Sequence, residues 1–260
     1  MRLIILGSGP SSGVPGVGFG WGRCDPSNPK NYRLRSSVLV EHENTRILID
    51  TSPDLRKQLL SQTTSHLDAV LFTHSHADHI NGIDDLRGIN RAMKSRILGY
   101  ADKKTFREIK KRFGYVINPL STNSVGYYYK PCIDLMEFTS GDKLKIKGID
   151  IQTIEQDHGF SKSVGFRFEK IAYTTDVKRL SNKAFKLLAG IEIWVIGVFT
   201  DKEHQTHVDL EEALRWIRKV SPKKAILTHM GPQLDYQMVQ QTTPKNVYPA
   251  YDGMVIDTSS

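Results

Sequence analysis

Four side chains of the kinds that bind metals stand within six consecutive positions of this sequence. They form the pattern HxHxDH, made by His74, His76, Asp78 and His79. No ordinary core or surface needs three imidazoles and a carboxylate so close together, so the pattern indicates a metal site. The largely apolar run Leu67–Phe72 before it predicts a buried strand. A strand that ends in clustered ligands delivers them to the rim of a sheet, where sites are usually built.

The bulk composition is that of a globular protein. The chain has 260 residues, of which 39% are hydrophobic and 25% charged, and this is enough for a sizeable core. No stretch approaches the roughly 20 apolar residues of a membrane span. The apolar run Leu3–Leu6 is too short for a secretory signal. We therefore expect a cytoplasmic protein with no membrane partner.

Cysteine content and chain organisation give two further expectations. Cys24 and Cys132 are too few for a disulfide framework, so we expect free, reduced thiols. The sequence shows no internal repeat, no low-complexity tract and no convincing linker. We therefore predict one domain over residues 1–260.

The basic balance of the chain favours anionic partners. Lysine and arginine number 36 against 28 aspartate and glutamate, which gives a net charge of +8. A local basic group lies between Lys103 and Arg112 and is typical of the solvated face of a helix. Charge by itself therefore makes an anionic substrate reasonable and identifies nothing more.

Strands and helices alternate along the sequence, which predicts the α/β class. The helix Asp209–Val220 has Asp209 as its expected N-cap and acidic residues in its first turn. The segment from Gly7 to Gly22 holds seven glycines and two prolines and predicts a long loop. Because it lacks a GxGxxG pattern, we do not expect a dinucleotide site there.

Three more candidate ligands follow predicted strands. His158 comes after Asp150–Ile154, Asp176 after Lys170–Thr175, and His229 after Lys224–Thr228. In extended chain His74 and His76 can point to the same side, and Asp78 continues that phase before the chain turns and His79 follows. One segment could thus supply His74 and His76 to one ion and Asp78 and His79 to the other. Two ions need about six to eight ligands, which these additional residues help to supply. Asp176 is the natural bridge, since its two carboxylate oxygens can each bind one ion.

The HxHxDH segment, with the later histidines and aspartate, resembles the metallo-β-lactamase superfamily over nearly the whole chain. The resemblance implies a four-layer αβ/βα sandwich with a binuclear site at one edge. It assigns His74, His76 and His158 to one ion, Asp78, His79 and His229 to the other, and Asp176 to both.

Four further segments give a finer resemblance. Gly7–Pro15, the run Arg33-x-Arg35-Ser36-Ser37, Gly82–Arg87 and Ala250–Met254 are similar to the phosphodiesterase family of the carbon–phosphorus lyase pathway, a branch close to tRNase Z. The resemblance implies hydrolysis of phosphodiesters with two divalent ions, zinc or manganese.

The sequence departs from that family at one place. Its members carry a structural zinc site with several cysteines after the glycine loop and a histidine three positions beyond the final ligand. Here the loop has only Cys24, and Pro232 stands at the histidine's position. We therefore expect that this third metal site is absent.

The chemistry implied is attack on phosphorus by a metal-bridging hydroxide. Asp78 could orient that hydroxide while it binds metal. The leaving oxygen needs a general acid, and histidine has a suitable pKa. In tRNase Z-like enzymes a histidine that binds no metal contacts the phosphate just before the equivalent helix. His207 is therefore the first candidate for the acid, and His204 is the second.

Several alternatives stay open at this point. The chain could instead be a metal-dependent nucleotide- or RNA-binding protein, or another hydrolase of the same fold, of thioesterase or lactamase type. We favour a small anionic phosphodiester, cyclic or nucleotide-like, over nucleic acid as the substrate, and a homodimer is left open. Arg33 and Arg35 could contact phosphate, but they could equally be solvated or paired internally.

Overall fold

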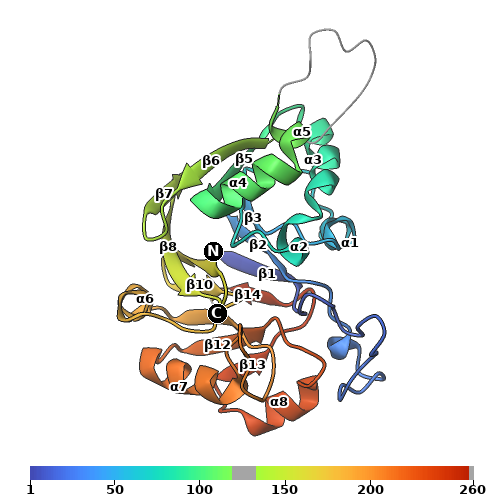
Figure 1. Cartoon of the computed structure of the whole chain (residues 1–260), viewed down its shortest axis with the longest axis vertical. Helices are drawn as coiled ribbons and strands as arrows, with labels where there is room; N and C mark the ends of the chain where they lie inside the picture. Colours follow the sequence, from blue (N-terminus) through green and yellow to red (C-terminus); the bar gives the residue numbers. More distant parts are fainter. Residues whose placement is uncertain (119–132, 258–260) are drawn as a thin grey trace.

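The computed structural model describes residues 1–118 and 133–257, and in them the chain forms two seven-stranded sheets (Figure 1). The first sheet has the order β14-β1-β2-β3-β4-β5-β6. Its strands are Arg2–Gly7 (β1), Ser37–His42 (β2), Thr45–Ile49 (β3), Ala69–Leu71 (β4), Ile97–Asp102 (β5), Ile133–Phe138 (β6) and Val255–Asp257 (β14). The second has the order β13-β12-β11-β10-β9-β8-β7. Its strands are Lys143–Ile146 (β7), Ile149–Asp157 (β8), Lys162–Phe168 (β9), Ile171–Thr174 (β10), Ile193–Gly197 (β11), Lys224–Thr228 (β12) and Val247–Pro249 (β13).

Both faces of each sheet are buried, which explains the continuous apolar runs of the sequence. Side chains alternate across a strand. In β1, Leu3 and Ile5 face the core between the two sheets, while Ile4 faces the helices that cover the first sheet. In β11, Val195 faces the same central core and Trp194 faces the other way. One core thus joins the sheets, and a further core lies outside each of them.

Helices cover the two outer faces (Figure 1), so the molecule has four layers, as the sequence predicted. α1, α3 and α4 pack on the first sheet, and α6, α7 and α8 pack on the second. The helices are Leu55–Ser61 (α1), Ala77–Ile80 (α2), Leu86–Met93 (α3), Lys103–Arg112 (α4), Gly114–Ile117 (α5), Asn182–Leu188 (α6), Leu210–Val220 (α7) and Tyr236–Thr242 (α8), with 3-10 turns at Pro29–Asn31 (η1) and Ile83–Asp85 (η2).

The strands that precede the candidate ligands end at one edge of the molecule. β3, β4 and β5 run parallel in the first sheet, as do β10, β11 and β12 in the second. The carboxyl ends of parallel strands lie together, and this is where open α/β sheets usually build sites. The Val164 N–H of β9 donates to the Thr73 carbonyl at 2.9 Å, which ties the two sheets together beside this edge.

The start of α7 and the glycine-rich loop have the local structure that the sequence predicted. Asp209 does cap α7, because its carboxylate accepts a hydrogen bond from Glu212 N at 3.0 Å. The glycine-rich segment has no helix or strand between β1 and η1. No helix in the described part of the chain is long and apolar enough to cross a membrane. Cys24 is a buried free thiol, and Cys132 lies outside the described residues.

Candidate metal centre

The strand ends bring the predicted ligands into one cluster. His74 lies three residues past β4, and His158 follows β8 directly. Asp176 lies two residues past β10, and His229 follows β12 directly. The first sheet thus supplies one wall of the cluster and the second sheet supplies the other.

The local prediction for Asp78 was wrong, because the chain does not stay extended that far. The helical turn α2 begins at Ala77, with His76 as its N-terminal flanking residue at ψ 154°. The turn places Asp78 beside His79 rather than in line with His74. The two adjacent residues then serve the same side of the site.

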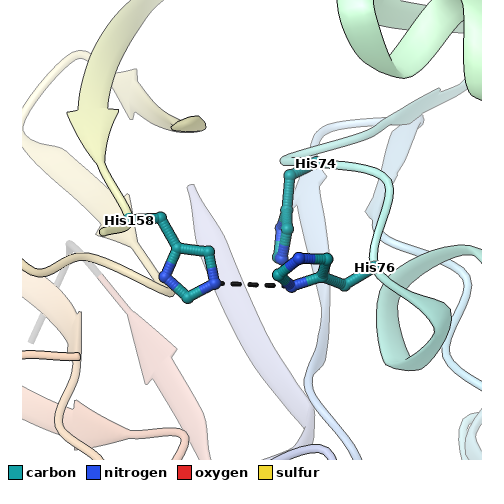
Figure 2. Close-up of side chains that lie close together, drawn as sticks. All are labelled: His74, His76 and His158. Carbon is teal, nitrogen blue, oxygen red and sulfur yellow. Dashed lines mark hydrogen bonds between the residues drawn. The ribbon is translucent and has the colours of Figure 1, made fainter. Parts of the chain in front are cut away.

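The first group of side chains consists of His74, His76 and His158 (Figure 2). Their nearest ring nitrogens all lie within 4.8 Å of one another. His158 Nε2 is 3.4 Å from His76 Nδ1, although the two residues come from different sheets. Two ligands about 2.1 Å from a tetrahedral ion lie roughly 3.4 Å apart, so this spacing fits a shared ion.

The second group consists of Asp78, His79 and His229, whose ligand atoms also lie within 4.8 Å of one another. All three side chains are buried. His79 Nε2 is 3.2 Å from Asp78 Oδ2. The rings of His79 and His229 stack, with centroids 5.9 Å apart. These two groups have the membership that the sequence resemblance implied, but the same 4.8 Å spacing also holds for His74, His79 and Asp176 and for His158, Asp176 and His207. The assignment of each ligand to one ion therefore stays a prediction.

Asp176 lies between these two groups. Its Oδ2 is 3.2 Å from His79 Nε2, and its Oδ1 is 3.4 Å from His229 Nε2 and 3.7 Å from His158 Nε2. Thr175 Oγ1 donates to Oδ2 at 2.7 Å and holds the carboxylate in this orientation. One carboxylate thus presents its oxygens to both groups, which is the arrangement a bridge requires.

Hydrogen bonds orient the imidazoles from outside the cluster. Asp50 Oδ2 lies 2.7 Å from His79 Nδ1, and the Thr206 carbonyl accepts from His158 Nδ1 at 2.8 Å. Ser36 Oγ lies 2.9 Å from His229 Nδ1. In metal sites such partners fix the tautomer and leave the other nitrogen free for the ion.

Asp50 was not identified as a site residue from the sequence. It follows β3 directly, the same strand-end position that singled out Asp176 and His229, so a signal was present. All three residues adopt the left-handed backbone region, with φ of 62°, 51° and 56°. This conformation costs non-glycine residues roughly 1–3 kcal/mol and clusters at functional sites.

The buried polar atoms of the cluster fit a metal ion. His74 Nε2 and His79 Nε2 are buried and make no hydrogen bond of good geometry, although carboxylate oxygens of Asp78 and Asp176 lie 3.2 Å from His79 Nε2. Buried polar groups normally have partners, so each of these atoms indicates a missing ligand. The donor set of imidazoles and carboxylates is one that zinc and manganese accept.

The pKa shifts of the buried histidines also fit a bound cation. Burial lowers the pKa of His74 well below its usual value, which leaves a neutral imidazole that can bind a cation. Burial would also lower the pKa of His79, but the carboxylates of Asp78, Asp176 and Asp50 raise it well above its usual value. These carboxylates thus favour a positive charge at this position, which a bound cation would supply.

The two histidines proposed for proton transfer lie beside this cluster. The His207 ring is 4.9 Å from that of His158 and 5.0 Å from that of His229, measured between centroids. His207 Nδ1 is 3.8 Å from Asp176 Oδ1. His204 lies farther from the cluster, with its ring centroid 5.3 Å from that of His207, and the Phe199 ring packs against both imidazoles.

The two arginines considered for phosphate contact are paired internally. Arg33 is 1% exposed, and its guanidinium donates to the carbonyls of Met230, Gly231 and Leu234. Arg35 forms a two-pronged pair with Asp54, at 2.7 and 2.8 Å. Both guanidinium groups therefore bind other parts of the protein, which is the internal pairing that the sequence left open.

Sequence comparisons find relatives along most of the chain. The family model described as a beta-lactamase superfamily domain matches residues 45–230. An octanoyltransferase of Porphyromonas gingivalis is 31% identical over 259 residues, which are 98% of this chain and 51% of that protein. This chain thus spans about half of that relative. A ribonuclease Z of Methanopyrus kandleri is 24% identical over 278 residues, covering 88% of this chain and 93% of the relative.

A solved structure agrees over the full length. A diphosphatase from the PhnP family superposes with a TM-score of 0.88 at 30% sequence identity, covering 98% of this chain and 97% of its own. The family resemblance and the sandwich fold predicted from the sequence are confirmed by these matches.

Proposed function

This chain belongs to the metallo-β-lactamase superfamily, and from that membership we propose that it is a binuclear metal-dependent hydrolase that cleaves phosphodiester or diphosphate bonds. The observation that carries the proposal is the position of Asp176 between two sets of candidate ligands, all of which except His76 are buried. A diphosphatase and a ribonuclease Z among the similar proteins support a phosphorus-centred reaction.

In this proposal the two ligand sets hold two divalent ions, zinc or manganese. Such ions neutralise the phosphoryl oxygens and make a bound water nucleophilic near neutral pH. The first ion would be held by His74, His76 and His158, the second by Asp78, His79 and His229, with Asp176 shared.

In this proposal Asp78 would orient the attacking water. It lies at the second ligand set, and its Oδ2 faces His79 Nε2 at 3.2 Å. A carboxylate has more lone pairs than one ion uses, so its second oxygen can accept a hydrogen bond from the water. Its pKa is lowered by His79 against the effect of burial, so it stays ionised at neutral pH.

His207 is the candidate that gives a proton to the leaving oxygen. Burial lowers its pKa to about 3, so the ring is neutral at pH 7 in the free protein. An anionic phosphate bound against the ring would favour the protonated form. Proton loading would then accompany substrate binding, and His207 would act in the complex rather than in the free enzyme.

His204 belongs to the outer part of the site. It lines a hollow of about 530 Å³ together with Phe160, Lys178 and Arg179. Lys178 and Arg179 offer cations to an anionic group in this hollow, although Glu203 also lines it. We therefore assign His204 to binding the part of the substrate beyond the scissile bond, and keep it as the second candidate for the acid.

The experiment that tests the proposal is hydrolysis of bis(p-nitrophenyl) phosphate by protein loaded with zinc or manganese. Wild-type protein should release p-nitrophenol. Asp176→Ala should reduce the rate at least 100-fold, while His42→Ala, which changes a histidine away from the cluster, should leave it unchanged. Equal rates in wild type and Asp176→Ala would refute the bridging role.

A second substrate tests whether His207 is the general acid. p-Nitrophenolate is stable enough to leave as an anion, whereas an alkoxide needs a proton from a general acid as it leaves. His207→Ala should therefore slow a dialkyl-type or nucleotide phosphodiester by 100-fold or more and slow bis(p-nitrophenyl) phosphate much less. If both substrates slowed equally, His207 would not be the acid, and His204→Ala would be compared in the same way.

A further inference from the structure

The net charge of the chain is concentrated in one short segment. Residues 86–112 contain ten basic and two acidic residues, a net charge of +8. The remaining 233 residues hold 26 basic residues (36 less 10) and 26 acidic ones (28 less 2), so they are neutral in sum. This segment, α3-β5-α4, therefore carries the whole formal charge excess of the protein.

The helices turn these cations outward. On α4, Lys103, Arg107 and Lys110 recur at i, i+4 and i+7 and are exposed, while Thr105 and Ile109 on the other side are buried. Residues at this spacing share one side of a helix. The stripe from Lys103 to Lys111 is about 12 Å long at 1.5 Å per residue.

The helix α3 repeats the pattern. Arg87 and Arg91 are four residues apart and exposed, while Leu86 and Ile89 are buried, and the exposed Lys94 follows the last residue of the helix. The apolar sides of α3 and α4 belong to the same core against the first sheet. Figure 1 shows the two helices at the same end of the molecule. Their outward sides together form what we call the basic face.

The cations of α4 are not neutralised by the protein itself. Within the described residues, no ion pair involves Lys103, Lys104, Arg107, Lys110 or Lys111. Of the two acidic residues in the segment, Asp102 caps α4, accepting from Thr105 N at 2.9 Å, and Glu108 is half-buried on α4 itself. A solvated helix face usually mixes both signs of charge, whereas this one is almost wholly positive.

The basic face adjoins the metal centre. Arg112, at the end of α4, donates to the Ser75 carbonyl at 2.9 Å and to Asn81 Oδ1 at 2.6 Å. These two acceptors flank the segment that carries His76 and His79. A polyanion lying along α4 would therefore reach the candidate catalytic site at one of its ends.

We infer that the basic face binds the sugar–phosphate backbone of a single-stranded nucleic acid whose phosphodiester enters the metal centre. The cleavage half of this inference rests on the proposed function, and the binding half does not. Repeated cations over about 12 Å match repeated phosphates, whereas a small phosphodiester held at the metal centre would not reach them. A membrane is the weaker fit, because the apolar sides of both helices are buried against the sheet and cannot insert.

The test compares two fourfold neutralised variants of the full-length, metal-loaded protein. The first removes charge from the basic face: Lys103→Gln, Arg107→Gln, Lys110→Gln and Lys111→Gln. The matched control removes four exposed cations of the second sheet and its connections: Lys143→Gln, Lys145→Gln, Lys147→Gln and Lys223→Gln. The probes are fluorescein-labelled U20 and dT20, with binding followed by anisotropy between 50 and 200 mM NaCl.

The basic-face variant should bind both probes at least tenfold more weakly than wild type at 100 mM NaCl. Its slope of log K against log salt should be shallower by about 2 to 3, since each phosphate contact contributes roughly 0.7 for a single strand. The control should change affinity less than twofold. Equal weakening in both variants, or no weakening in the first, would overturn the inference.

Two further measurements separate the possible failures. Both variants should hydrolyse bis(p-nitrophenyl) phosphate at the wild-type rate, because none of the changed residues lies in the metal centre. Absence of hydrolysis in every protein, with the binding difference intact, would refute the proposed function and leave the binding face standing. Binding of vesicles with 30% anionic lipid that depends on the basic face, without any binding of the oligonucleotides, would refute nucleic acid as the partner.

Discussion

Asp50 Oδ2 lies 2.7 Å from His79 Nδ1, and both side chains are completely buried. The same carboxylate accepts hydrogen bonds from Thr73 N at 2.8 Å and Thr73 Oγ1 at 2.7 Å. Asp50 therefore fixes the imidazole ring of His79 and is itself fixed by the residue that precedes His74. A residue that orients a metal-binding side chain in this way affects how strongly that side chain binds the ion.

Asp50→Asn should weaken binding of one of the two metal ions by 10- to 100-fold, because the amide holds the ring less strongly and with the wrong polarity. Titration of metal-free protein with zinc against a chelator of known affinity measures the change. Asp134→Asn, an exposed carboxylate far from the cluster, serves as the control. Unchanged affinity in a folded Asp50→Asn protein would show that this contact does not support the site.

Removing metal should lower the thermal midpoint, and returning zinc or manganese should restore it. His74 Nε2 and His79 Nε2 lack partners in the described structure, and buried carboxylates surround them. A ligand at 100 times its dissociation constant stabilises a protein by about 2.7 kcal/mol per site. Differential scanning fluorimetry with and without chelator measures the shift. Magnesium, which prefers oxygen ligands, should restore much less, and an equal response to magnesium would contradict the imidazole sites.

Arg33→Met should destabilise the fold by about 3–5 kcal/mol, because it removes the guanidinium hydrogen bonds to the carbonyls of Met230, Gly231 and Leu234. Gly231 O would still accept from Leu234 N, and Leu234 O from the Cys24 thiol. These carbonyls belong to the segment after His229, so the loop that presents this ligand should loosen as well. Arg23→Met removes a half-exposed pair with Asp201 and should cost at most about 1 kcal/mol. Urea unfolding of both variants measures the difference, and similar losses would show that Arg33 is not a structural anchor.

Burial raises the pKa of Asp252 to about 6, although hydrogen bonds from Leu34 N and Ser8 oppose the rise. The folded protein thus holds a proton that the unfolded chain releases near pH 4. This group therefore stabilises the fold below about pH 4, and its contribution is lost as pH rises from about 4 to 6, on the order of 1–3 kcal/mol. Urea unfolding at several pH values should show this slope in wild type and not in Asp252→Asn. An identical slope in the two proteins would rule out Asp252 as its source.

The layered fold and the main ligands could be predicted because both have strong local signals. Alternation within β1 places Leu3 and Ile4 on opposite faces of their sheet, and alternation within β11 does the same for Trp194 and Val195, without any knowledge of tertiary contacts. HxHxDH is a dense pattern, and His158 and His229 come directly after apolar strands. The prediction of one domain over residues 1–260 and the assignment of metal roles stay predictions.

Other features depend on contacts between distant parts of the chain. Asp50 has a strand-end position that could have marked it in the sequence, but its contact with His79 arises only because β3 lies beside β4. Arg33 was considered for phosphate binding, since nothing local shows that it is buried under Met230–Leu234. The turn at α2 is four residues long, too short for helical periodicity to show.

The central claim is that two ions share Asp176, and counting bound metal tests it most directly. Protein reconstituted with excess zinc or manganese and desalted should retain close to two equivalents per chain by elemental mass spectrometry. Asp176→Ala should retain one or fewer. Wild-type protein that retains no metal, or a single equivalent that Asp176→Ala leaves unchanged, would contradict the binuclear account.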